Sequence, residues 1–531
     1  MFIRTMKSFL SATAITVMLA GPILADTPAD TLVQAWQFDD IISLDPAEVF
    51  EFSGAEIAGN TYERLIGYDP NDVSKLHGVV AESWDVSEDG KTITFKIREG
   101  RKFASGNPLT AKDVAFSLQR AVKLDMSPAF IITQFGITKD NVDEKIKAVD
   151  DTTVTFEMDR PYALSFVLYC LTSTVASVVD SKLAMEHEKD GDFGYNWLKT
   201  NYAGSGPFKI RDWRANEVIV LERNENYSGE KPPLARVIYR HIPETATQRL
   251  MLEKGDIDIA RNLGPEEIEA VSKNDNIRIE KAPKGTVYYF SLNQKNEILA
   301  KPQVREAIKY LVDYDAIGDT IMKNLGIKHQ TFLPRGFLGE LDETPYKFDP
   351  EKAKKLLAEA GYPDGFEITM DVRNTQPIAG MAEAIQQTMA QGGVKMSIIP
   401  GDGKQTLTKY RARQHDMYIG QWGADYQDPH TNAQTFASNP DNSDEGTSKT
   451  LAWRNAWATP ELNKKVDAAI LESDIEKRAE MYREMQKEVN ETGPFVIMFQ
   501  QTEVAALNDK VKNFILGPTF DMNLVTQTSK E

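Results

Sequence analysis

Several side chains have the types and spacing that nucleophilic or metal-assisted chemistry uses, but the companions that such chemistry needs are missing. Ser228 and Lys231 have the S-x-x-K spacing of penicillin-recognising enzymes, yet Pro232-Pro233 follows where a helix is required, and no K-T-G or S-D-N motif accompanies it. None of the six histidines has the i, i+4 spacing of a helical metal pair, and no G-x-x-x-x-G-K phosphate loop is present. The sequence therefore predicts a protein that is not an enzyme and has no metal or cofactor.

The stretch from Val79 to Arg120 predicts the clearest local structure. Apolar residues at 93, 95 and 97 alternate with polar ones, as in a half-buried strand, and Asp89-Gly90 supplies the turn before them. Thr110 predicts a helix N-cap, and Asp113 places a carboxylate in the first turn, an acidic variant of the capping box. Apolar residues then recur at helical spacing, at Val114, Leu118 and Val122.

Two further helices have clear start and stop signals. Asp349 is the expected N-cap of one, with Pro350 at its first position and Gly361 as its stop. Thr459-Pro460 opens another, which is expected to run through Ile470. We interpret both as ordinary scaffold.

Matches to one family occur in a fixed order along nearly the whole chain. With the Val79–Arg120 region, the collinear segments resemble the dipeptide/oligopeptide class of periplasmic solute-binding proteins, extracellular solute-binding protein family 5, which are receptors of ABC importers. The other segments are GSGPFKIRDW (204–213), LERNENYSG (221–229), LEKGDIDIA (252–260), FSLNQ (290–294), VREAIKYLVDYDAI (304–317), DPEKAKKLLAEAGY (349–362) and QWGADYQDP (421–429).

The resemblance implies an α/β architecture, the bilobed periplasmic binding protein fold in its three-domain (cluster C) version. The first domain would be discontinuous, built from residues 26–63, 203–289 and 498–531. The second would occupy 64–202 and the third 290–497, with the ligand in a cleft between the first and third domains, which close by hinge motion. The mature chain of roughly 500 residues is too long for one core, which agrees with this division.

The same resemblance assigns ligand-binding roles within QWGADYQDP. Trp422 and Gly423 would offer backbone groups to an added ligand strand, and Asp425 would pair with a ligand ammonium. A desolvated ammonium needs a fixed counter-charge, and such a bond can anchor peptides of any composition. The alternative is that Asp425 only closes an Asx-turn before Asp428-Pro429.

The opposite wall of the cleft is expected to come from Phe50, Glu51 and Phe52, which follow a family-like S-L-D-P motif ending at Asp45-Pro46. Two phenylalanines at period two would equally suit an ordinary half-buried strand. Arg373 lies near a position where some dipeptide-binding relatives carry an arginine that pairs with the ligand carboxylate, a role that guanidinium suits; a surface arginine is the alternative.

The ligand class stays open at this point. About twenty residues before Asp425, where relatives often carry a pocket-lining tryptophan, this chain reads Gly401-Asp402-Gly403. An opine, an amino-sugar conjugate or an oligosaccharide is therefore an alternative to a short peptide. Haem and nickel receptors also occur in the family, although His430 alone is a poor ligand set.

The first residues predict export. Arg4 and Lys7 precede an apolar core from Phe9 to Leu24, and cleavage after Ala25 gives a signal peptide of residues 1–25, because the apolar part is shorter than the ~20 residues of a membrane span. No cysteine follows the cleavage point to accept a lipid, and the only cysteine is Cys170. A periplasmic protein without a lipid anchor is expected.

The net charge of the chain limits the classes of partner that it can bind. The formal charge of −18 becomes −20 without Arg4 and Lys7, which argues against nucleic acid and anionic lipid, since both need basic surface. The apolar run at 163–179 contains many hydroxyl side chains, so a buried segment is expected there.

We predict a monomeric receptor that passes a short peptide or peptide-like solute to an inner-membrane ABC permease. The rivals are a secreted peptide or cell-wall hydrolase and a chaperone-like envelope protein.

Overall fold

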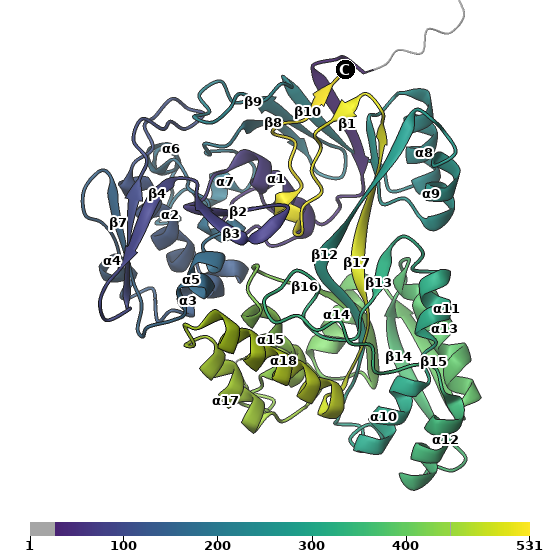
Figure 1. Cartoon of the computed structure of the whole chain (residues 1–531). Helices are drawn as coiled ribbons and strands as arrows, with labels where there is room; N and C mark the ends of the chain where they lie inside the picture. Colours follow the sequence, from purple (N-terminus) through teal and green to yellow (C-terminus); the bar gives the residue numbers. More distant parts are fainter. Residues whose placement is uncertain (1–26, 447) are drawn as a thin grey trace, which may run out of the picture.

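The chain forms two lobes that are joined by two long strands (Figure 1). The computed structural model describes residues 27–446 and 448–531, so the predicted signal peptide lies outside the described residues. The joining strands are β12 (Ile277–Leu292) and β17 (Phe495–Asn508), which pair with each other in antiparallel orientation. The elements between them form the second lobe, and all the others form the first lobe.

One sheet of eleven strands runs through both lobes. β1 pairs in parallel with β10 and β11, and β14 pairs in parallel with β15 and β16, while the other pairs are antiparallel. In spatial order the strands are β15 (Val394–Gly401), β14 (Phe366–Arg373), β16 (Met417–Gly423), β12, β17, β11 (Ile259–Arg261), β1 (Thr31–Trp36), β10 (Arg236–His241), β9 (Val218–Arg223) and β8 (Phe208–Arg214), with β13 (Gly326–Lys328) beside β17.

In the second lobe, β12 separates two hydrophobic cores. Because successive side chains of a strand point to opposite faces, Val287 and Tyr289 enter one core while Tyr288, Phe290 and Leu292 enter the other. Helices cover both faces, which gives the expected α/β layering. They are α10 (Pro302–Tyr310), α11 (Tyr314–Asp319), α12 (Pro350–Glu359), α13 (Ile378–Gln391), α14 (Gly403–Arg411), α15 (His430–Ala437), α16 (Leu451–Arg454), α17 (Pro460–Ala469) and α18 (Ile475–Thr492).

A separate four-stranded sheet lies at the outer end of the first lobe. Its order is β4 (Ala81–Val86), β5 (Thr92–Ile97), β7 (Thr153–Glu157) and β6 (Ile146–Ala148). The predicted hairpin turn is confirmed, with Gly90 at φ +71°. The predicted cap is also confirmed: Asp113 accepts a hydrogen bond of 2.9 Å from the backbone N–H of Thr110 at the start of α2 (Ala111–Leu124).

The remaining elements complete the first lobe. Two small antiparallel pairs are β2 (Ile66–Asp69) with β3 (Asp72–Gly78) and β18 (Val511–Lys512) with β19 (Ser529–Lys530). The helices are α1 (Phe52–Thr61), α3 (Phe130–Thr133), α4 (Val142–Lys145), α5 (Leu164–Cys170), α6 (Ser181–Glu186), α7 (Tyr195–Leu198), α8 (Thr245–Lys254) and α9 (Pro265–Val271), with 3₁₀ turns η1 (Ser127–Ala129), η2 (Thr174–Ala176) and η3 (Phe520–Met522).

Other sequence predictions can be compared with these elements. Asp349 caps α12 by accepting from the backbone N–H of Lys352, and α17 begins at Pro460, both as expected; α17 ends at Ala469, with Ile470 as its C-cap, one residue before the predicted end. Residues 163–179 form α5, η2 and their flanks, most of them buried, as the hydroxyl-rich pattern indicated. Among the described residues, no helix is both long enough and apolar enough to cross a membrane. The proposed domain boundaries stay predictions.

A cluster of buried charged side chains links the two long strands to the first lobe at the place where they enter it. The Lys284 ammonium on β12 lies 2.8 Å from a carboxylate oxygen of Glu503 on β17, and Arg261 of β11 contacts both Glu503 and Glu56 of α1. The side chain of Asn523, near the C-terminus, bonds to Glu56 at 2.9 Å and to Lys284 at 2.6 Å. Five separate segments therefore meet in one network, which fixes the base of the cleft described next.

Candidate functional site

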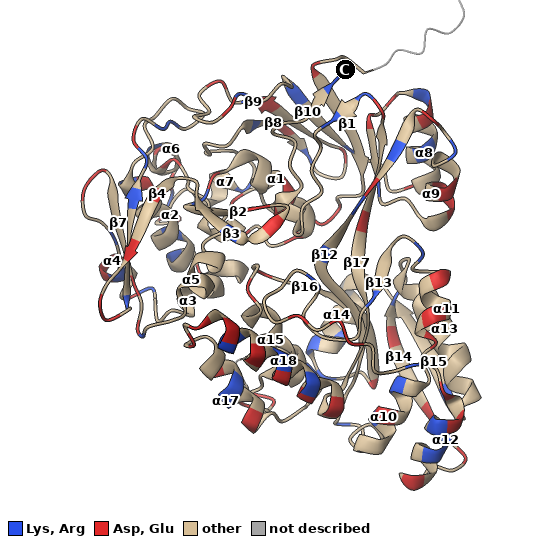
Figure 2. Ribbon diagram, in the orientation of Figure 1, with Lys and Arg blue, Asp and Glu red and all other residues tan. Residues whose placement is uncertain are grey.

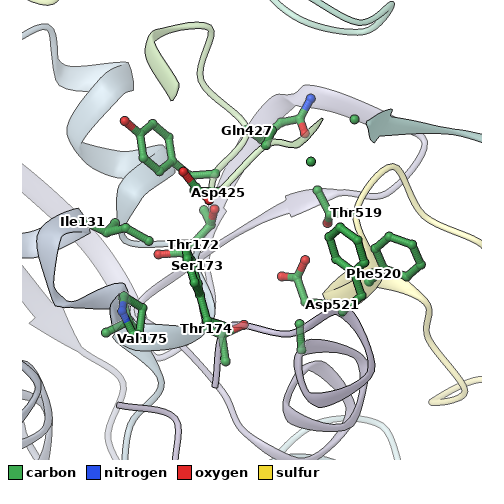
Figure 3. A pocket seen from close by; sticks show the side chains of 18 of the residues that line it. Ile131, Thr172, Ser173, Thr174, Val175, Asp425, Gln427, Thr519, Phe520 and Asp521 are labelled. Atoms are coloured by element: carbon green, nitrogen blue, oxygen red, sulfur yellow. The ribbon is translucent and has the colours of Figure 1, made fainter. Parts of the chain in front are cut away.

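A cleft lies between the lobes and is lined by segments from both of them (Figure 3). It encloses about 770 Å³ of space free of protein atoms, part of which is open to solvent. The lining residues are Val49, Phe50, Phe52, Ala55, Tyr68, Pro128, Ile131, Thr172, Ser173, Thr174, Val175, Gly285, Thr286, Gly423, Ala424, Asp425, Tyr426, Gln427, Pro518, Thr519, Phe520 and Asp521.

The floor of the cleft is an irregularity in β12. The pairing of β12 with β17 shifts register between Pro283 and Val287, and this frees the backbone of Gly285. Its carbonyl accepts from Ala424 of the second lobe at 3.0 Å, and its N–H donates to Pro518 of the first lobe at 2.9 Å. One residue of the crossing strand therefore positions a cleft segment on each side.

Asp425 follows the end of β16 and faces the cleft on the same side as Thr172 and Ser173 (Figure 3). Its backbone N–H donates to the Thr431 hydroxyl, and that hydroxyl donates to the Asp425 carboxylate, each at 3.2 Å. Part of the residue stays open to the cleft, but the surrounding protein desolvates the carboxyl and raises its pKa to about 7, although Thr431 and the charge of Arg454 act in the opposite direction. No cation among the described residues lies within 4 Å of it.

Asp428 has a different role, three residues further along. Both of its carboxylate oxygens accept from the Arg478 guanidinium at 2.7 Å, and both side chains are buried. Asp428 also accepts from the backbone N–H of His430 at 2.9 Å. The Asx-type turn considered for Asp425 is therefore formed by Asp428, which fixes the connection between β16 and α15.

On the opposite wall, Phe50 and Phe52 line the cleft, but the strand interpretation of this segment is wrong. Phe52 is the first residue of α1 and Glu51 is its N-cap, because two phenylalanines at period two do not by themselves distinguish a strand from an extended approach to a helix. Phe52 stacks on Phe520 with ring centroids 4.4 Å apart. Its ring also covers Gly423, where an added Cβ would lie 2.9 Å from it.

Three residues of the predicted set do not line the cleft. Glu51 turns back to its own loop and accepts from the Phe50 N–H at 3.3 Å; burial raises its pKa. Trp422 packs against the second-lobe core, and its buried indole N–H has no hydrogen-bond partner among the described residues. Arg373 ends β14 as an exposed side chain beside Gly403, so its proposed pairing with a ligand carboxylate stays a prediction.

Two cleft walls were not predicted from the sequence. Thr172, Ser173 and Thr174 present a row of hydroxyl-bearing residues, and Asp521 lies across the cleft from them (Figure 3). Asp521 is paired with Arg64 at 2.6 Å. The only available signal was the series of Ser and Thr residues within the apolar run at 163–179.

The cleft has an acidic character. Its lining contains two carboxylates and neither lysine nor arginine, and the ion pair with Arg64 neutralises Asp521. Asp425 is thus left as the carboxylate that has no ionic partner. Such a site can bind a cation through a charge-assisted hydrogen bond while aromatic rings and hydroxyls contact the rest of a ligand.

Catalytic and metal chemistry find little support in the geometry. Among the described residues, no group of three His, Cys, Asp or Glu side chains is arranged to hold a metal ion. Burial lowers the pKa of His329 and His415 to about 4 and that of His430 to about 3, so these rings are neutral at pH 7. Lys231 is paired with Glu225 at 2.5 Å in a loop, away from the helical setting that an S-x-x-K nucleophile requires.

Two lobes joined by two long strands, with a lined cleft between them, define a class of solute-binding protein. The chain matches the family described as bacterial extracellular solute-binding proteins, family 5 Middle, over residues 75–444, and it belongs to this family. The bilobed α/β fold and the family predicted from the sequence are both confirmed.

Individual relatives cover almost the whole chain. It is 29% identical over 504 residues to a probable D,D-dipeptide-binding periplasmic protein, DdpA, of Escherichia coli K12, covering 94% of this chain and 93% of that protein. It is 28% identical to the dipeptide-binding protein of the same strain, covering 86% of each. Among solved structures, the periplasmic binding protein DppA of Helicobacter pylori, in complex with the peptide STSA, has a TM-score of 0.80 at 27% identity, covering 94% of this chain and 98% of that one.

Proposed function

We propose that this protein captures a short peptide or peptide-like solute in the interlobe cleft, with the solute's ammonium group held by Asp425. The observation that carries the proposal is the Asp425 carboxyl itself. It is desolvated enough to raise its pKa to about 7, it has no cationic partner among the described residues, and it faces the cleft. A ligand ammonium would supply the missing counter-charge and return the carboxyl to its ionised form.

The surrounding surfaces suit the rest of such a ligand. The segment from Gly423 to Gln427 brings backbone groups to the cleft wall, where an extended chain could bond to them. Phe50, Phe52 and Phe520 offer apolar contact for side chains of varied size. The peptide-binding relatives named above support the same ligand class.

A second candidate ligand follows from the hydroxyl-bearing wall. The Thr172 and Ser173 hydroxyls donate to the backbone carbonyls of Tyr169 and Cys170, so their remaining lone pairs can accept hydrogen bonds from the hydroxyls of a polyhydroxylated molecule. An opine or an amino-sugar conjugate has such hydroxyls and can also carry a cationic nitrogen for Asp425. An oligosaccharide without a charge would leave Asp425 unpaired and is less well matched.

The transport role extends the family assignment. We infer that the mature protein works in the periplasm and delivers its solute to an inner-membrane ABC permease. Reversible closure of the lobes on the solute would provide the signal that a permease reads. Binding without chemical change is expected, which makes the protein a receptor and not a hydrolase.

Thermal unfolding with a ligand panel tests the proposal. Because a ligand that binds only the folded chain stabilises it, a hundredfold excess over Kd should raise the free energy of unfolding by about 2.7 kcal/mol. Di- to pentapeptides should do this, and their N-acetylated forms should not. A response to opines or amino sugars with none to peptides would replace the ligand class. An equal response to free and acetylated peptides would remove Asp425 from the ammonium role.

Turnover is checked in the same samples. Mass spectrometry of the ligand after incubation should recover it unchanged, and scattering should show a smaller radius of gyration when ligand is present. Steady product release without compaction would favour the hydrolase alternative.

A further inference from the structure

A second hollow lies in the second lobe and has the opposite charge to the cleft. We call it the basic pocket, and it encloses about 1030 Å³ of space free of protein atoms, part of it open to solvent. Its lining holds five cationic side chains and one carboxylate, in a chain whose formal charge is −18. The lining residues are Lys295, Arg411, Ala412, Arg413, Asp444, Lys449, Trp453 and Arg454. By contrast, α12, α17 and α18 each carry both acidic and basic residues (Figure 2).

Two of the five cations form ion pairs within the protein. Arg413 contacts Asp444 at 2.9 Å and also donates to the backbone carbonyl and the side-chain oxygen of Asn442. Lys295 lies 2.7 Å from the same Asp444 carboxylate. The only carboxylate of the lining is therefore already shared by two cations, and it cannot neutralise the others.

The remaining two arginines have no such partner. Arg454 donates from Nε to the Lys449 carbonyl at 3.1 Å and lies over the Tyr410 ring, 5.4 Å from its centroid. Its terminal nitrogens, and the whole Arg411 guanidinium, make no hydrogen bond and no ion pair with the described residues. Desolvation, followed by the positive charge of Arg454, lowers the pKa of Arg411, so the two like charges lie close enough to repel each other.

The Trp453 ring forms part of the wall beside these arginines. The Trp453 indole N–H donates to the Ser443 carbonyl at 2.7 Å, which fixes the ring. The Lys449 ammonium sits 3.7 Å from the ring centroid and the Arg413 guanidinium 4.5 Å from it, as in cation–π contacts. Lys449 is thus held at the rim as a third cation near the two unpaired arginines.

We propose that the basic pocket binds an anionic oxygen group, a carboxylate or a phosphate, between Arg411 and Arg454, with Lys449 at the rim. Guanidinium forks match the two oxygens of such groups, and an anion between Arg411 and Arg454 would relieve the repulsion between their charges. Arg413 and Arg478 are buried and paired, whereas Arg411 is exposed and Arg454 half-buried, and these two guanidiniums share one hollow whose only carboxylate is already used.

The anionic group has two possible sources. It can belong to the far end of the solute whose ammonium Asp425 holds, in which case the inference rests on the proposed function. The positive charge of Arg454 acts to lower the pKa of the Asp425 carboxyl, against the larger effect of desolvation, as expected for a group within electrostatic range of the cleft. Alternatively, the group is a separate small anion, and the basic pocket then works independently of the cleft.

Calorimetric titration of the whole protein with inorganic phosphate and with citrate at low ionic strength tests the proposal. Saturable binding is expected, and Arg411→Gln/Arg454→Gln should weaken it by roughly tenfold or more, the loss for a charged hydrogen-bond donor. The matched control is Arg211→Gln/Arg214→Gln, which removes the same charge from exposed positions of β8 and should bind as the unaltered protein does. Equal weakening in both variants, or no saturable binding, would overturn the proposal.

Thermal stability provides a readout that a structural role would not give. Without anion, the Arg411→Gln/Arg454→Gln variant should melt at the same temperature as the unaltered protein or higher, because a repulsion has been removed. If these arginines held the fold together instead, the variant would melt lower and the proposal would be wrong.

Competition separates the two sources. Simultaneous binding of phosphate and a cleft ligand, with phosphate affinity unchanged in Asp425→Asn, indicates a separate anion. Displacement of phosphate by a peptide whose own affinity falls in the arginine variant indicates the far end of the solute. Phosphate binding by a protein that binds no peptide or opine would support the basic pocket while the proposed function fails.

Discussion

Asp425 and Asp428 lie three positions apart in the connection between β16 and α15, and they show how a binding carboxylate differs from a structural one. Both oxygens of the Asp428 carboxylate accept from Arg478, and one also accepts from the backbone N–H of His430, so nothing is left for a ligand. Asp425 has only the Thr431 hydroxyl and a desolvated carboxyl that faces the cleft. Burial alone does not identify a site; burial without a counter-charge does.

The largest effect should come from breaking the structural pair. Asp428→Ala leaves the Arg478 guanidinium buried and unpaired, and we expect the free energy of unfolding to fall by about 3–5 kcal/mol. Denaturant unfolding measures this loss. The double variant Asp428→Leu/Arg478→Met should recover a large part of it, because no buried charge remains; a double variant as unstable as the single one would contradict this explanation.

Asp425→Asn should impair ligand binding and not the fold. The fold should persist, while affinity for the cleft ligand falls by about 2–5 kcal/mol, the range for losing one partner of a buried charge pair. Calorimetry with the ligand identified by the panel measures it. The control is Asp467→Asn, which removes one exposed charge from α17. If both variants bind equally well, Asp425 is not the ammonium partner.

The raised pKa of Asp425 predicts a pH dependence of the ligand-free protein. The pKa rises from 3.8 to about 7 in the folded chain, so between these values the folded state holds a proton that the unfolded state releases. This part of the stability is therefore complete below about pH 4 and is lost as the pH rises through 7. Unfolding curves from pH 4 to 8 should show the decline, and Asp425→Asn should lack it. If the stability of the unaltered protein and of Asp425→Asn depended on pH in the same way, this prediction would be wrong.

The smallest effect is expected at Gly423. An alanine Cβ there would lie 2.9 Å from the Phe52 ring and 3.2 Å from the Thr286 hydroxyl, so the ring must shift and narrow the cleft. Ligand affinity should fall by about 1 kcal/mol with little change in stability. Gly318→Ala is the control, because its Cβ would meet Phe499 at 3.4 Å, an ordinary contact. Greater loss in the control would show that Gly423 has no special position.

Local signals in the sequence were sufficient for much of the fold. The cap formed by Thr110 and Asp113, the Asp349-Pro350 helix start and the Asp89-Gly90 turn each depend on neighbours within a few residues, which the sequence displays directly. Alternate side chains of β12 enter the two different cores, as the geometry of a strand requires, although the sequence does not say which helices cover each face.

The site was only partly predictable. Asp425, Gly423, Phe50 and Phe52 were assigned from a motif and from family position, and the structure brings these four to one cleft. Thr172 to Thr174 and Asp521 lie more than three hundred residues apart, and only the folding of the first lobe puts them on facing walls. No local pattern encodes that approach. The basic pocket was missed for the same reason, since Arg411 and Arg454 come from different helices.

The buried network around Lys284 also determines the order in which the chain can fold. Glu56 near the start of the described chain, Lys284 at the middle and Asn523 near the end must all be present before the charges are compensated. β17 likewise inserts between β11 and β12. The first lobe therefore cannot finish folding until the last residues have been delivered, and contacts of such long sequence separation make folding slow. A chain that completes its core late keeps its apolar residues accessible for longer after synthesis.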